Sequence, residues 1–545
     1  SPIYFLSCNY ESAKLMCADY SNPKETKYAA PVHVYFNSKV PDRIIKLIKE
    51  ENVRKYMKTF CEIHNDFLVL EDRVFSLNGG YESFANLYIN KDSKADEYDL
   101  RAKQLVGLCV SLEEAPAIRY SGGSRQAKSM AEMFNDQFNA TKAALKEWKP
   151  NEHQSVLFIF DRKDDPLTPF LHSLAFQPMV HDLLYDDILE NGSKIRGLFS
   201  DESKDQDVRD MPDETDLVWV QYRHEFIRDV GQRLPKQFEE WQAKNAVVKL
   251  KQKGGNNDVK TKDLISAARD MPQYQKLVKQ YTTNINMANK LMQIFKNSGL
   301  YDIIQLEQDM ATGIDIDGNK VDRTKMQQQF GELLNNASVD QQVKLRAFMM
   351  YVISQGGMKP ETRKTFLKQS NFDTDAEDTI LNLGCLSVQL NQKGSEKSGG
   401  CDNYWKQVVK TAKAATKGDS LTRFTSFLEW TLTEHLSGKL SEKDFPWISK
   451  PQTQKKQQPK SYRKHKKNQD NEDNNASSQA SKSGPRYIVY FLGGVSHSEI
   501  KTCYEFSKNN EVDIFVGSTL IYSPQQYLQC FQKTGSHNEE EKGDE

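Results

Sequence analysis

Strand-like and helix-like patterns are distributed unevenly along this chain of 545 residues. Near both ends, short apolar runs rich in β-branched and aromatic side chains alternate with helical stretches. This order is typical of parallel, doubly wound sheets. The first three runs are Ile3–Leu6, Val32–Phe36 and Phe67–Leu70, and Asp42 can cap a helical stretch between the last two. We therefore predict a first α/β domain over residues 1–78.

A second strand pattern is divided between two distant parts of the chain. Val156–Phe160 is a continuous apolar run of the kind found in strands buried on both faces, and Leu217–Val220 is a shorter run. Tyr487–Leu492 and Val512–Val516 continue the pattern near the C-terminus. The stretch Leu100–Leu145 has a helical pattern that is broken by Pro116. These runs predict further strands on either side of a long central region.

The central region has a different character. From Arg223 to about Leu440 the patterns are helical and the residues are rich in Gln, Lys, Asn and Met, which predicts an all-α domain. Pro272 suits the first turn of a new helix and would end or kink the previous one. Gly254–Asn257 is a flexible stretch before it. Beyond Pro272, an apolar stripe that begins at Tyr274 is either core or a groove for a partner, and spacing alone does not separate the two.

Two segments near the C-terminus are predicted to lack a fixed structure. Residues 451–483 contain almost no apolar side chains and read as a disordered linker. Within it, Lys460–Lys467 could be a nuclear signal or a membrane-surface patch, but nearby acidic residues favour a solvated linker. Residues 536–545 form an acidic tail.

The composition excludes several classes of protein. The hydrophobic content of 38% suffices for a sizeable core, and the net charge of −1 argues against a nucleic-acid-binding domain. No apolar run reaches the roughly 18 residues that a transmembrane helix needs, and Ser1 does not open a signal segment. The eight cysteines are scattered without CxxC pairs, which predicts reduced thiols in a cytosolic protein.

A search for catalytic motifs leaves one weak candidate. Asp161, Asp164 and Asp165 follow a predicted strand, where α/β enzymes often bind metals or perform acid–base chemistry. They define the alternative function of a metal-dependent hydrolase or phosphoryl-transfer enzyme. The interleaved Arg162 and Lys163, together with two prolines, instead favour a structural turn. There is no P-loop, GxGxxG, HExxH or GxSxG motif.

Three further features favour structural roles. In Phe491–Val495, two glycines stand between a strand and a helix, which is typical of a tight turn. Asp315–Asn319 resembles a calcium loop, but its glycine comes too early and no Glu follows at the twelfth position. His172 and His181 lie near the aspartates without metal-ligand spacing, so we interpret them as structural.

Several stretches together resemble the SM family of syntaxin-binding SNARE regulators. Phe160–Pro169, followed by Leu171–Met179 and Asp182–Leu184, is similar to the family signature, although the family usually has Ala where this chain has Pro178. Further matching stretches are Ala115–Tyr120, Met271–Lys276, Gly484–Ser496 and Gly517–Thr519. Those that contain Met-Pro-Gln-Tyr-Gln and Leu-Gly-Gly-Val-Ser are most like the exocytic, Munc-type branch. The signature positions are Asp161, Arg162, Asp165, Pro166, Pro169, Gly493 and Gly494.

This resemblance implies the fold and the function. It implies a three-domain arch of α/β class, with doubly wound parallel sheets in the first two domains. Residues 79–215 and 484–535 would share the second domain, and 216–450 would be a large helical insertion. The family normally has an additional strand–helix–strand stretch before the segment that matches Ile3–Leu6, so part of the first domain is expected to be missing. The implied function is a non-catalytic scaffold, without a cofactor, that binds a syntaxin-type SNARE and promotes SNARE assembly in vesicle docking and fusion.

The resemblance also implies partners, location and two binding sites. We expect a cytoplasmic monomer that reaches membranes, most of all the plasma membrane, only through its SNARE partner, and that binds no nucleic acid. A pocket for the N-terminal peptide of the syntaxin would be lined by Ile45, Met57, Phe60 and Glu62, with an acidic rim that attracts a basic peptide. Alternatively, Ile45 and Met57 are simply core. A helical hairpin that engages SNARE helices would include Asp263, Pro272, Tyr274 and Ile285.

Overall fold

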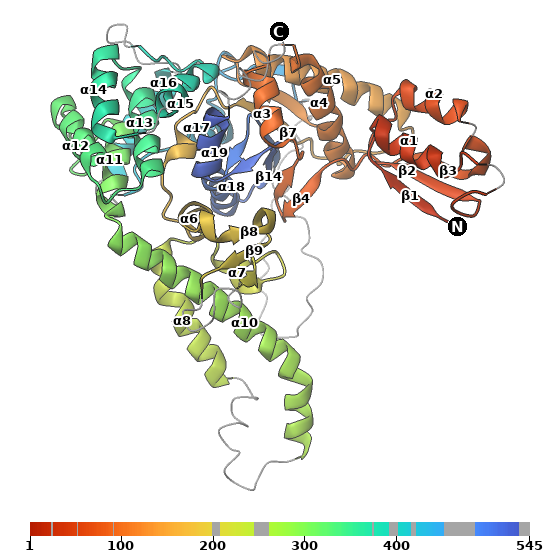
Figure 1. Cartoon of the computed structure of the whole chain (residues 1–545), viewed down its shortest axis with the longest axis horizontal. Helices are drawn as coiled ribbons and strands as arrows, with labels where there is room; N and C mark the ends of the chain where they lie inside the picture. Colours follow the sequence, from red (N-terminus) through yellow and green to blue (C-terminus); the bar gives the residue numbers. More distant parts are fainter. Residues whose placement is uncertain are drawn as a thin grey trace, which may run out of the picture.

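The structure is a computed structural model. Its described residues are 1–22, 25–51, 53–90, 92–198, 208–244, 261–372, 375–391, 402–415, 421–451 and 485–533. Figure 1 shows a small N-terminal domain at one side of a larger body, and a long helical hairpin projecting from the body, as expected of an arch. Apart from Pro451, the predicted linker (451–483) lies outside the described residues, and so do the acidic tail (536–545) and Gly254–Asn257.

The first domain contains a three-stranded parallel sheet in the order β1-β2-β3. Its strands are β1 (Ile3–Leu6), β2 (Val32–Phe36) and β3 (Met57–Glu62), and its helices are α1 (Tyr10–Ala18) and α2 (Asp42–Glu50). Alternate side chains of β2 (Val32, Val34 and Phe36) are buried in one cluster with residues of both helices. Ile3 and Phe5 of β1 are exposed. Asp42 does not cap α2, because it is the first helical residue after the N-cap Pro41.

The second domain is built on a seven-stranded sheet in the order β11-β6-β7-β12-β14-β5-β4. The strands are β4 (Leu68–Glu71), β5 (Val74–Ser76), β6 (Ala117–Tyr120), β7 (Val156–Asp161), β11 (Trp447–Ser449), β12 (Arg486–Leu492) and β14 (Asp513–Ser518). In the centre, β12 pairs in parallel with both β7 and β14, so segments on either side of the helical insertion share one sheet. The strands β4 and β5 also belong here, which corrects their assignment to the first domain.

Both faces of this sheet are buried. Leu157 and Ile159 point into one hydrophobic cluster, whereas Phe158 and Phe160 point into another on the opposite face. This alternation explains the continuous apolar run in the sequence, because a strand covered on both sides has no face for polar residues. The helices of this domain are α3 (Gly80–Tyr88), α4 (Lys94–Ser111), α5 (Arg125–Ala144), α6 (Phe176–Leu183), α18 (His497–Asn510) and α19 (Pro524–Gln532). A short parallel pair, β13 (Val495–Ser496) and β15 (Ile521–Tyr522), lies beside the sheet.

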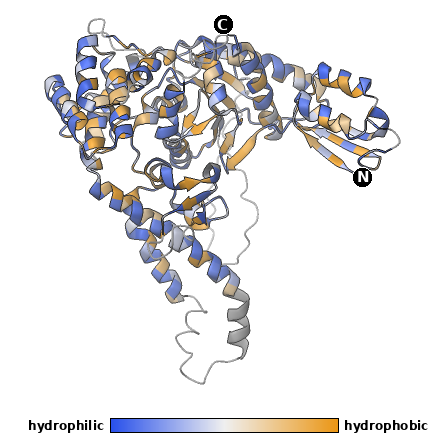
Figure 2. Cartoon of the chain, in the orientation of Figure 1, coloured by the Kyte–Doolittle hydropathy of each residue, from blue (hydrophilic) through white to orange (hydrophobic). Residues whose placement is uncertain are grey.

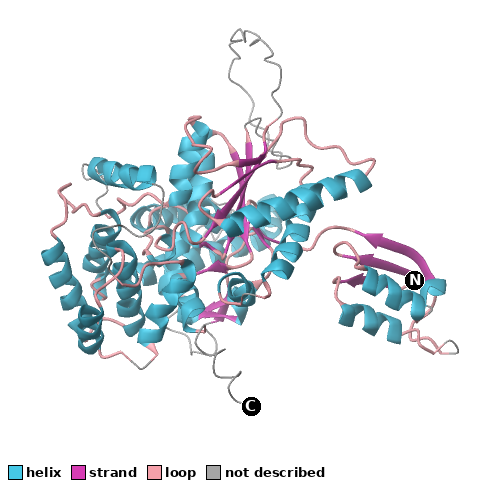
Figure 3. Cartoon of the chain, turned by 90° about the horizontal axis from the view of Figure 1, so that it is seen from above, coloured by secondary structure: helices cyan, strands magenta, loops and turns pink. Residues whose placement is uncertain are grey.

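The described residues of the predicted insertion, 216–450, are mainly helical, and Figure 3 shows its helices packed beside the sheet. The end of this range is an exception, because β11 belongs to the seven-stranded sheet. Its helices are α7 (Leu217–Tyr222), α8 (Ile227–Lys244), α10 (Thr261–Asn297), α11 (Leu300–Thr312), α12 (Arg323–Asn335), α13 (Gln341–Gln355), α14 (Pro360–Ser370), α15 (Ala376–Leu381), α16 (Asp402–Ala415) and α17 (Phe427–Leu436). A small antiparallel sheet, β10-β9-β8, combines β8 (Ile188–Leu189), β9 (Lys194–Arg196) and β10 (Val208–Asp210).

Two further predictions about individual elements are wrong. Leu217–Val220 belongs to the helix α7 and not to a strand, since the Asp216 carboxylate accepts a hydrogen bond from Trp219 N and caps the helix. The helical stretch Leu100–Leu145 contains the strand β6, which the pattern did not reveal.

Within the described residues, no helix is long and apolar enough to cross a membrane, and seven cysteines are free thiols.

Candidate functional site

A cavity of about 360 Å³ lies between α2 and β3 of the first domain. Its lining residues are Ile45, Ile48, Lys49, Arg54, Met57, Lys58, Thr59 and Phe60. Three of the four predicted pocket residues, Ile45, Met57 and Phe60, are therefore brought together. Phe60 is 44% exposed and its ring lies 5.6 Å from that of Phe36. Ile45 and Met57 are half-buried: they pack against the core of the domain and also line the cavity.

The fourth predicted residue, Glu62, does not line this cavity. Its Oε1 atom accepts a hydrogen bond of 2.8 Å from Val40 N, which holds the carboxylate at the far end of β3. The ionic lining instead consists of Lys49, Arg54 and Lys58, and no carboxylate among the described residues lines the cavity. The expected acidic rim is thus replaced by a basic one, which favours an acidic group beside an apolar anchor.

The helical hairpin consists of α8 and α10, the two helices that project from the body in Figure 1. Aromatic rings join them: Trp241 of α8 lies 5.3 Å from Tyr274 and 5.8 Å from Tyr281, both of α10. Phe238 stacks on Tyr281 at 4.9 Å. Such ring pairs contribute about 0.5–1.5 kcal/mol each beyond the burial of their surface. They hold the hairpin together along one side.

Pro272 lies inside a continuous α10, so the prediction that it opens a new helix is wrong. The proline still removes one backbone donor from the helix, which makes it a locally weak point. Ile285 is half-buried and packs against the hydrophobic cluster at the base of the hairpin. Asp263 also belongs to α10, and Tyr274 contacts α8 through Trp241. All four predicted residues therefore lie on α10. Asp263 comes before the weak point at Pro272, and Tyr274 and Ile285 come after it.

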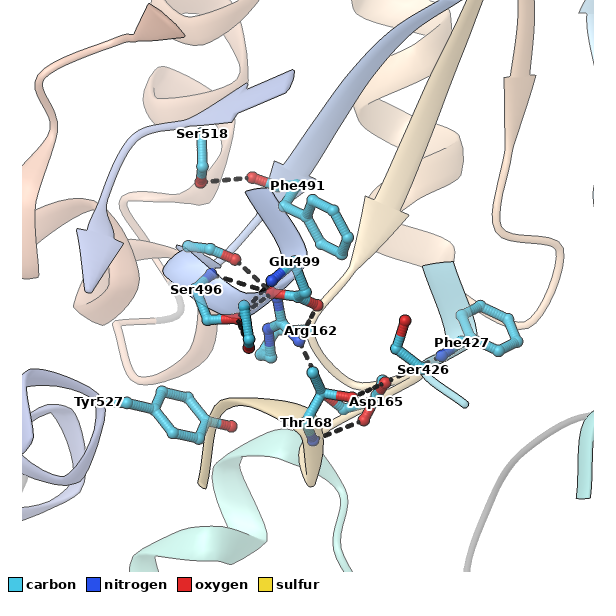
Figure 4. Close-up of polar contacts among 12 residues, drawn as sticks. Arg162, Asp165, Thr168, Ser426, Phe427, Phe491, Ser496, Glu499, Ser518 and Tyr527 are labelled. Atoms are coloured by element: carbon cyan, nitrogen blue, oxygen red, sulfur yellow. Dashed lines mark hydrogen bonds and ion pairs between the residues drawn. The ribbon is translucent and has the colours of Figure 1, made fainter. Parts of the chain in front are cut away.

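The signature residues form a buried network (Figure 4). The Arg162 guanidinium donates hydrogen bonds to both Glu499 carboxylate oxygens, at 2.9 and 2.8 Å. It also donates to the carbonyl oxygens of Asp165 and Gly494. Glu499 in turn accepts from the backbone and hydroxyl of Ser496 and completes a capping box at the start of α18. This network joins the loop after β7 to the loop after β12.

Asp165 connects the same loop to the helical region. Its carboxylate accepts hydrogen bonds from Thr168 N at 2.9 Å and from Phe427 N at 3.1 Å, the latter at the start of α17. The Pro166 carbonyl accepts from the Tyr527 hydroxyl at 3.2 Å, and Pro169 lies in a short 3-10 turn. These contacts assign the signature a structural role.

Gly493 and Gly494 form the tight turn that the sequence predicts. Both have positive φ, +88° and +105°, a backbone conformation that favours glycine. A Cβ atom at Gly493 would also collide with the Tyr88 ring, and one at Gly494 would collide with the Tyr522 ring. The turn is therefore fixed by close packing and contains no phosphate-binding loop motif.

The aspartate cluster has the geometry of a structural turn. Asp161 accepts hydrogen bonds from the Tyr88 hydroxyl, from Ser124 and from Lys163 N. The half-buried Asp164 accepts a hydrogen bond from Asp161 N, and desolvation together with the Asp161 charge raises the pKa of the Asp164 carboxyl to about 7. In the described part of the chain, no three His, Cys, Asp or Glu side chains are arranged to hold a metal ion. The Asp161 oxygens are thus engaged by protein donors.

The remaining candidates are also structural. His172 Nδ1 lies 2.7 Å from Glu307 and its Nε2 lies 3.2 Å from Arg346, so both ring nitrogens have partners. His181 stacks on His497 with ring centroids 3.8 Å apart, and burial lowers its pKa to about 4. In the loop that resembles a calcium site, the Asp315 carboxylate accepts from the backbone N–H groups of residues 317 and 319. Lys460–Lys467 lies outside the described residues.

Some features of these sites were not found from the sequence. Nothing in the spacing of Lys49, Arg54 and Lys58 indicated that they converge on one cavity. The aromatic contacts had a weak signal, because Phe238 and Trp241 are three positions apart and Tyr274 and Tyr281 are seven apart, which places each pair on one helix face. Only the packing of α8 against α10 reveals that the two pairs meet.

Comparisons with known proteins agree with the signature. The model of the Sec1 family matches residues 1–530. The chain is 28% identical over 539 residues to a Dictyostelium discoideum protein named protein transport protein sec1, covering 96% of this chain and 86% of that protein. A Schizosaccharomyces pombe protein of the same name is 27% identical over 516 residues, covering 92% of this chain and 71% of that protein.

Solved structures share the fold. The Unc18–syntaxin 1 complex from Monosiga brevicollis is similar with a TM-score of 0.76 and 22% identity, covering 98% of this chain and 87% of that chain. The SM protein Vps45, in complex with the Qa SNARE Tlg2, is similar with a TM-score of 0.72 and 18% identity, covering 98% and 86%. Since the family match extends over nearly the whole sequence, this protein belongs to the Sec1 family.

Proposed function

We propose that this protein is a non-catalytic scaffold that binds a syntaxin-type SNARE and promotes SNARE assembly in vesicle docking and fusion. The membership of the Sec1 family carries this proposal. It is supported by relatives named for protein transport and by structures of the same fold that were solved with syntaxin or with a Qa SNARE. Exocytosis at the plasma membrane is the proposed step, with the protein recruited through its SNARE partner.

The cavity of the first domain is the proposed site for the N-terminal peptide of the SNARE. Its floor of Ile45, Met57 and Phe60 suits one apolar anchor side chain, and such buried anchors supply most of the affinity of a short peptide. The basic side chains at its edge would attract an acidic residue next to that anchor. The proposed pocket therefore prefers an acidic peptide, whereas the resemblance implied a preference for a basic one.

The α8–α10 hairpin is the proposed site for SNARE helices. Its long helix, held against α8 by the stacking of Tyr274 on Trp241, would hold partner helices side by side. Formation of a helical bundle is limited by the entropy of bringing together and ordering its helices, and a scaffold that positions them lowers this cost. Such work is positional and needs no catalytic group.

Calorimetry with purified syntaxin-type cytosolic domains, each with and without its N-terminal peptide, tests the proposal. We expect binding to at least one of them, weakened by deletion of the peptide and by Phe60→Asp. Leu15→Asp is the matched control, because Leu15 is exposed on α1 of the same domain and does not line the cavity. Binding that ignores both changes would move the contact to the hairpin or elsewhere. The absence of binding to any syntaxin-type domain would refute the proposal.

A further inference from the structure

The seven-stranded sheet ends at β4, whose side chains form an exposed aliphatic strip. Leu68, Val69 and Leu70 are 48%, 70% and 48% exposed, the only three consecutive large hydrophobic residues so exposed in the described chain. Strand β4 pairs with β5 on one side, and among the described residues no strand pairs with its other edge. In Figure 2 this strand is mostly orange, the colour of hydrophobic residues. At the opposite end of the sheet, β11 also has one edge that pairs with no described strand, but the ring of its Trp447 is covered by the Arg119 guanidinium.

A β-bulge directs part of this strip toward a cleft. Val69 lies opposite Phe75 and Glu71 lies opposite Val74, so Leu70 is the extra residue of the bulge. Bulges change the direction of the side chains next to them. Leu70 and Glu71 both line a cleft of about 720 Å³ that continues past α6 and α7. The aliphatic edge and the cleft therefore form one continuous surface.

The cleft is acidic. Its lining includes four carboxylates, those of Glu71, Asp186, Asp213 and Glu214, and Arg223 is the one Lys or Arg among its described lining residues. Arg223 is only 2% exposed and already contacts Glu214 at 2.6 Å and Glu71 at 3.5 Å. Asp186 and Asp213 are exposed, and neither forms an ion pair within 4 Å with another described residue. Hydrogen bonds from Thr215, and then the nearby charge of Lys276, lower the pKa of the Asp213 carboxyl. A basic side chain of a ligand would thus find two carboxylates that no described cation pairs.

We propose that this surface binds an extended segment of a partner protein, which adds as a strand to β4 and places a Lys or Arg near Asp186 and Asp213. A free strand edge offers unpaired N–H and C=O groups, and strand addition satisfies them while alternate side chains of the partner cover the aliphatic strip. A helix would cover the side chains but leave the edge unpaired. The acidic cleft then selects for a basic flank. This site shares no residue with the cavity of the first domain, whereas the segment 210–215, part of which lines the cleft, contacts α10 through Lys279 and Gln280. The proposal does not depend on which SNARE is bound.

A library of random 12-residue peptides displayed on phage, selected against the full chain, provides the probe. We expect enriched peptides with apolar residues at alternate positions and a Lys or Arg at one flank. By fluorescence anisotropy, Val69→Lys should weaken their binding at least tenfold. Leu15→Lys should not, although Leu15 is equally exposed at 70%. Asp213→Asn should weaken binding several-fold at low salt and little at high salt, because salt screens exposed charges.

Hydrogen exchange of the wild-type chain gives an independent readout. Bound peptide should protect backbone amides within residues 68–71, because an added strand hydrogen-bonds to them. The proposal is overturned if no peptide is enriched, if binding is the same in the Val69→Lys variant, or if residues 68–71 gain no protection. Enrichment of acidic peptides would overturn the assignment of a basic flank.

Discussion

The Arg162 guanidinium and the Glu499 carboxylate form a doubly hydrogen-bonded ion pair between residues 337 positions apart, and neither side chain is exposed beyond 1%. The pair joins the two separated halves of the second domain at the loops that follow β7 and β12. A buried ion pair is weak evidence of net stabilisation, but removal of one partner leaves an uncompensated charge in a medium that solvates it poorly.

Glu499→Gln is therefore expected to lower the free energy of unfolding by about 3–5 kcal/mol. Chemical denaturation, followed by circular dichroism, measures this change. The control is Glu505→Gln on the same helix, since Glu505 pairs with Lys501 at the surface and is 46% exposed. Its effect should stay within about 1 kcal/mol. Equal effects of the two substitutions would contradict the structural role of the signature pair.

Asp164→Asn is expected to change the pH dependence of stability. The pKa of the Asp164 carboxyl is about 7 in the folded chain, above its ordinary value of 3.8. Between these two pH values the folded state binds a proton that the unfolded state releases. The contribution of this carboxyl to the free energy of unfolding is therefore present below pH 3.8 and is lost as the pH rises through 7. The loss is at most about 1.4 kcal/mol per pH unit. The variant should gain stability relative to wild type as the pH rises from about 4 to 8.

The measurement for Asp164 is the unfolding free energy of both proteins over this pH range. Their difference cancels the contributions that both proteins share, such as that of His181, which acts in the opposite direction. The pKa of His181 is about 4 when folded, so acidification below 6.5 favours the unfolded state. Parallel curves for the two proteins would show that Asp164 has no raised pKa.

Pro272→Ala is expected to strengthen α10, because it restores a backbone donor and relieves the clash of the ring with the preceding turn. In a helix interior a proline costs about 3 kcal/mol relative to alanine. Hydrogen exchange of α10 amides next to residue 272 should become slower. Pro235→Ala is the matched control, since Pro235 lies inside α8 of the same hairpin. Pro235→Ala should slow hydrogen exchange in α8 alone. An unchanged exchange rate in α10 of the Pro272→Ala variant would contradict this account.

Lys58→Glu is expected to weaken binding of a SNARE N-terminal peptide that carries an acidic residue beside its anchor. Roughly a five- to tenfold loss is the expected scale, and it should shrink at high salt. Titration calorimetry at two salt concentrations measures it. Lys14→Glu is the control, because Lys14 is exposed on α1 and does not line the cavity. A gain in affinity for Lys58→Glu would show that the peptide is basic after all.

Much of the fold could be predicted from local pattern, and the errors have physical causes. Val156–Phe160 and Tyr487–Leu492 were readable as strands because they are buried on both faces. The helix at Leu217–Val220 was not predicted, because a short apolar run fits a helix and a strand equally well. In the structure, the Asp216 side chain caps this segment as a helix. The strand β6 contains Arg119, whose charge hides the pattern. Its guanidinium is buried and donates to the carbonyls of residues 445, 440 and 441.

The candidate pocket could likewise be predicted only in part from the sequence. Ile45, Met57 and Phe60 could be placed by resemblance, and they meet in one cavity. The positive charge around them could not be predicted, because Lys49, Arg54 and Lys58 are brought together by the packing of α2 against β3. Glu62 was expected at the rim, but its hydrogen bond to Val40 N holds it elsewhere.

Local periodicity and short stretches of residues were enough to establish the α/β class, the helical character of the middle region and the family. Three-dimensional packing was needed to establish which strands share a sheet, where β4 lies, and which charges face a cavity. Each of these depends on contacts between residues far apart in the chain, which no local pattern encodes. The pairing of β7 with β12, which lie side by side in the sheet, arises only when the whole chain folds.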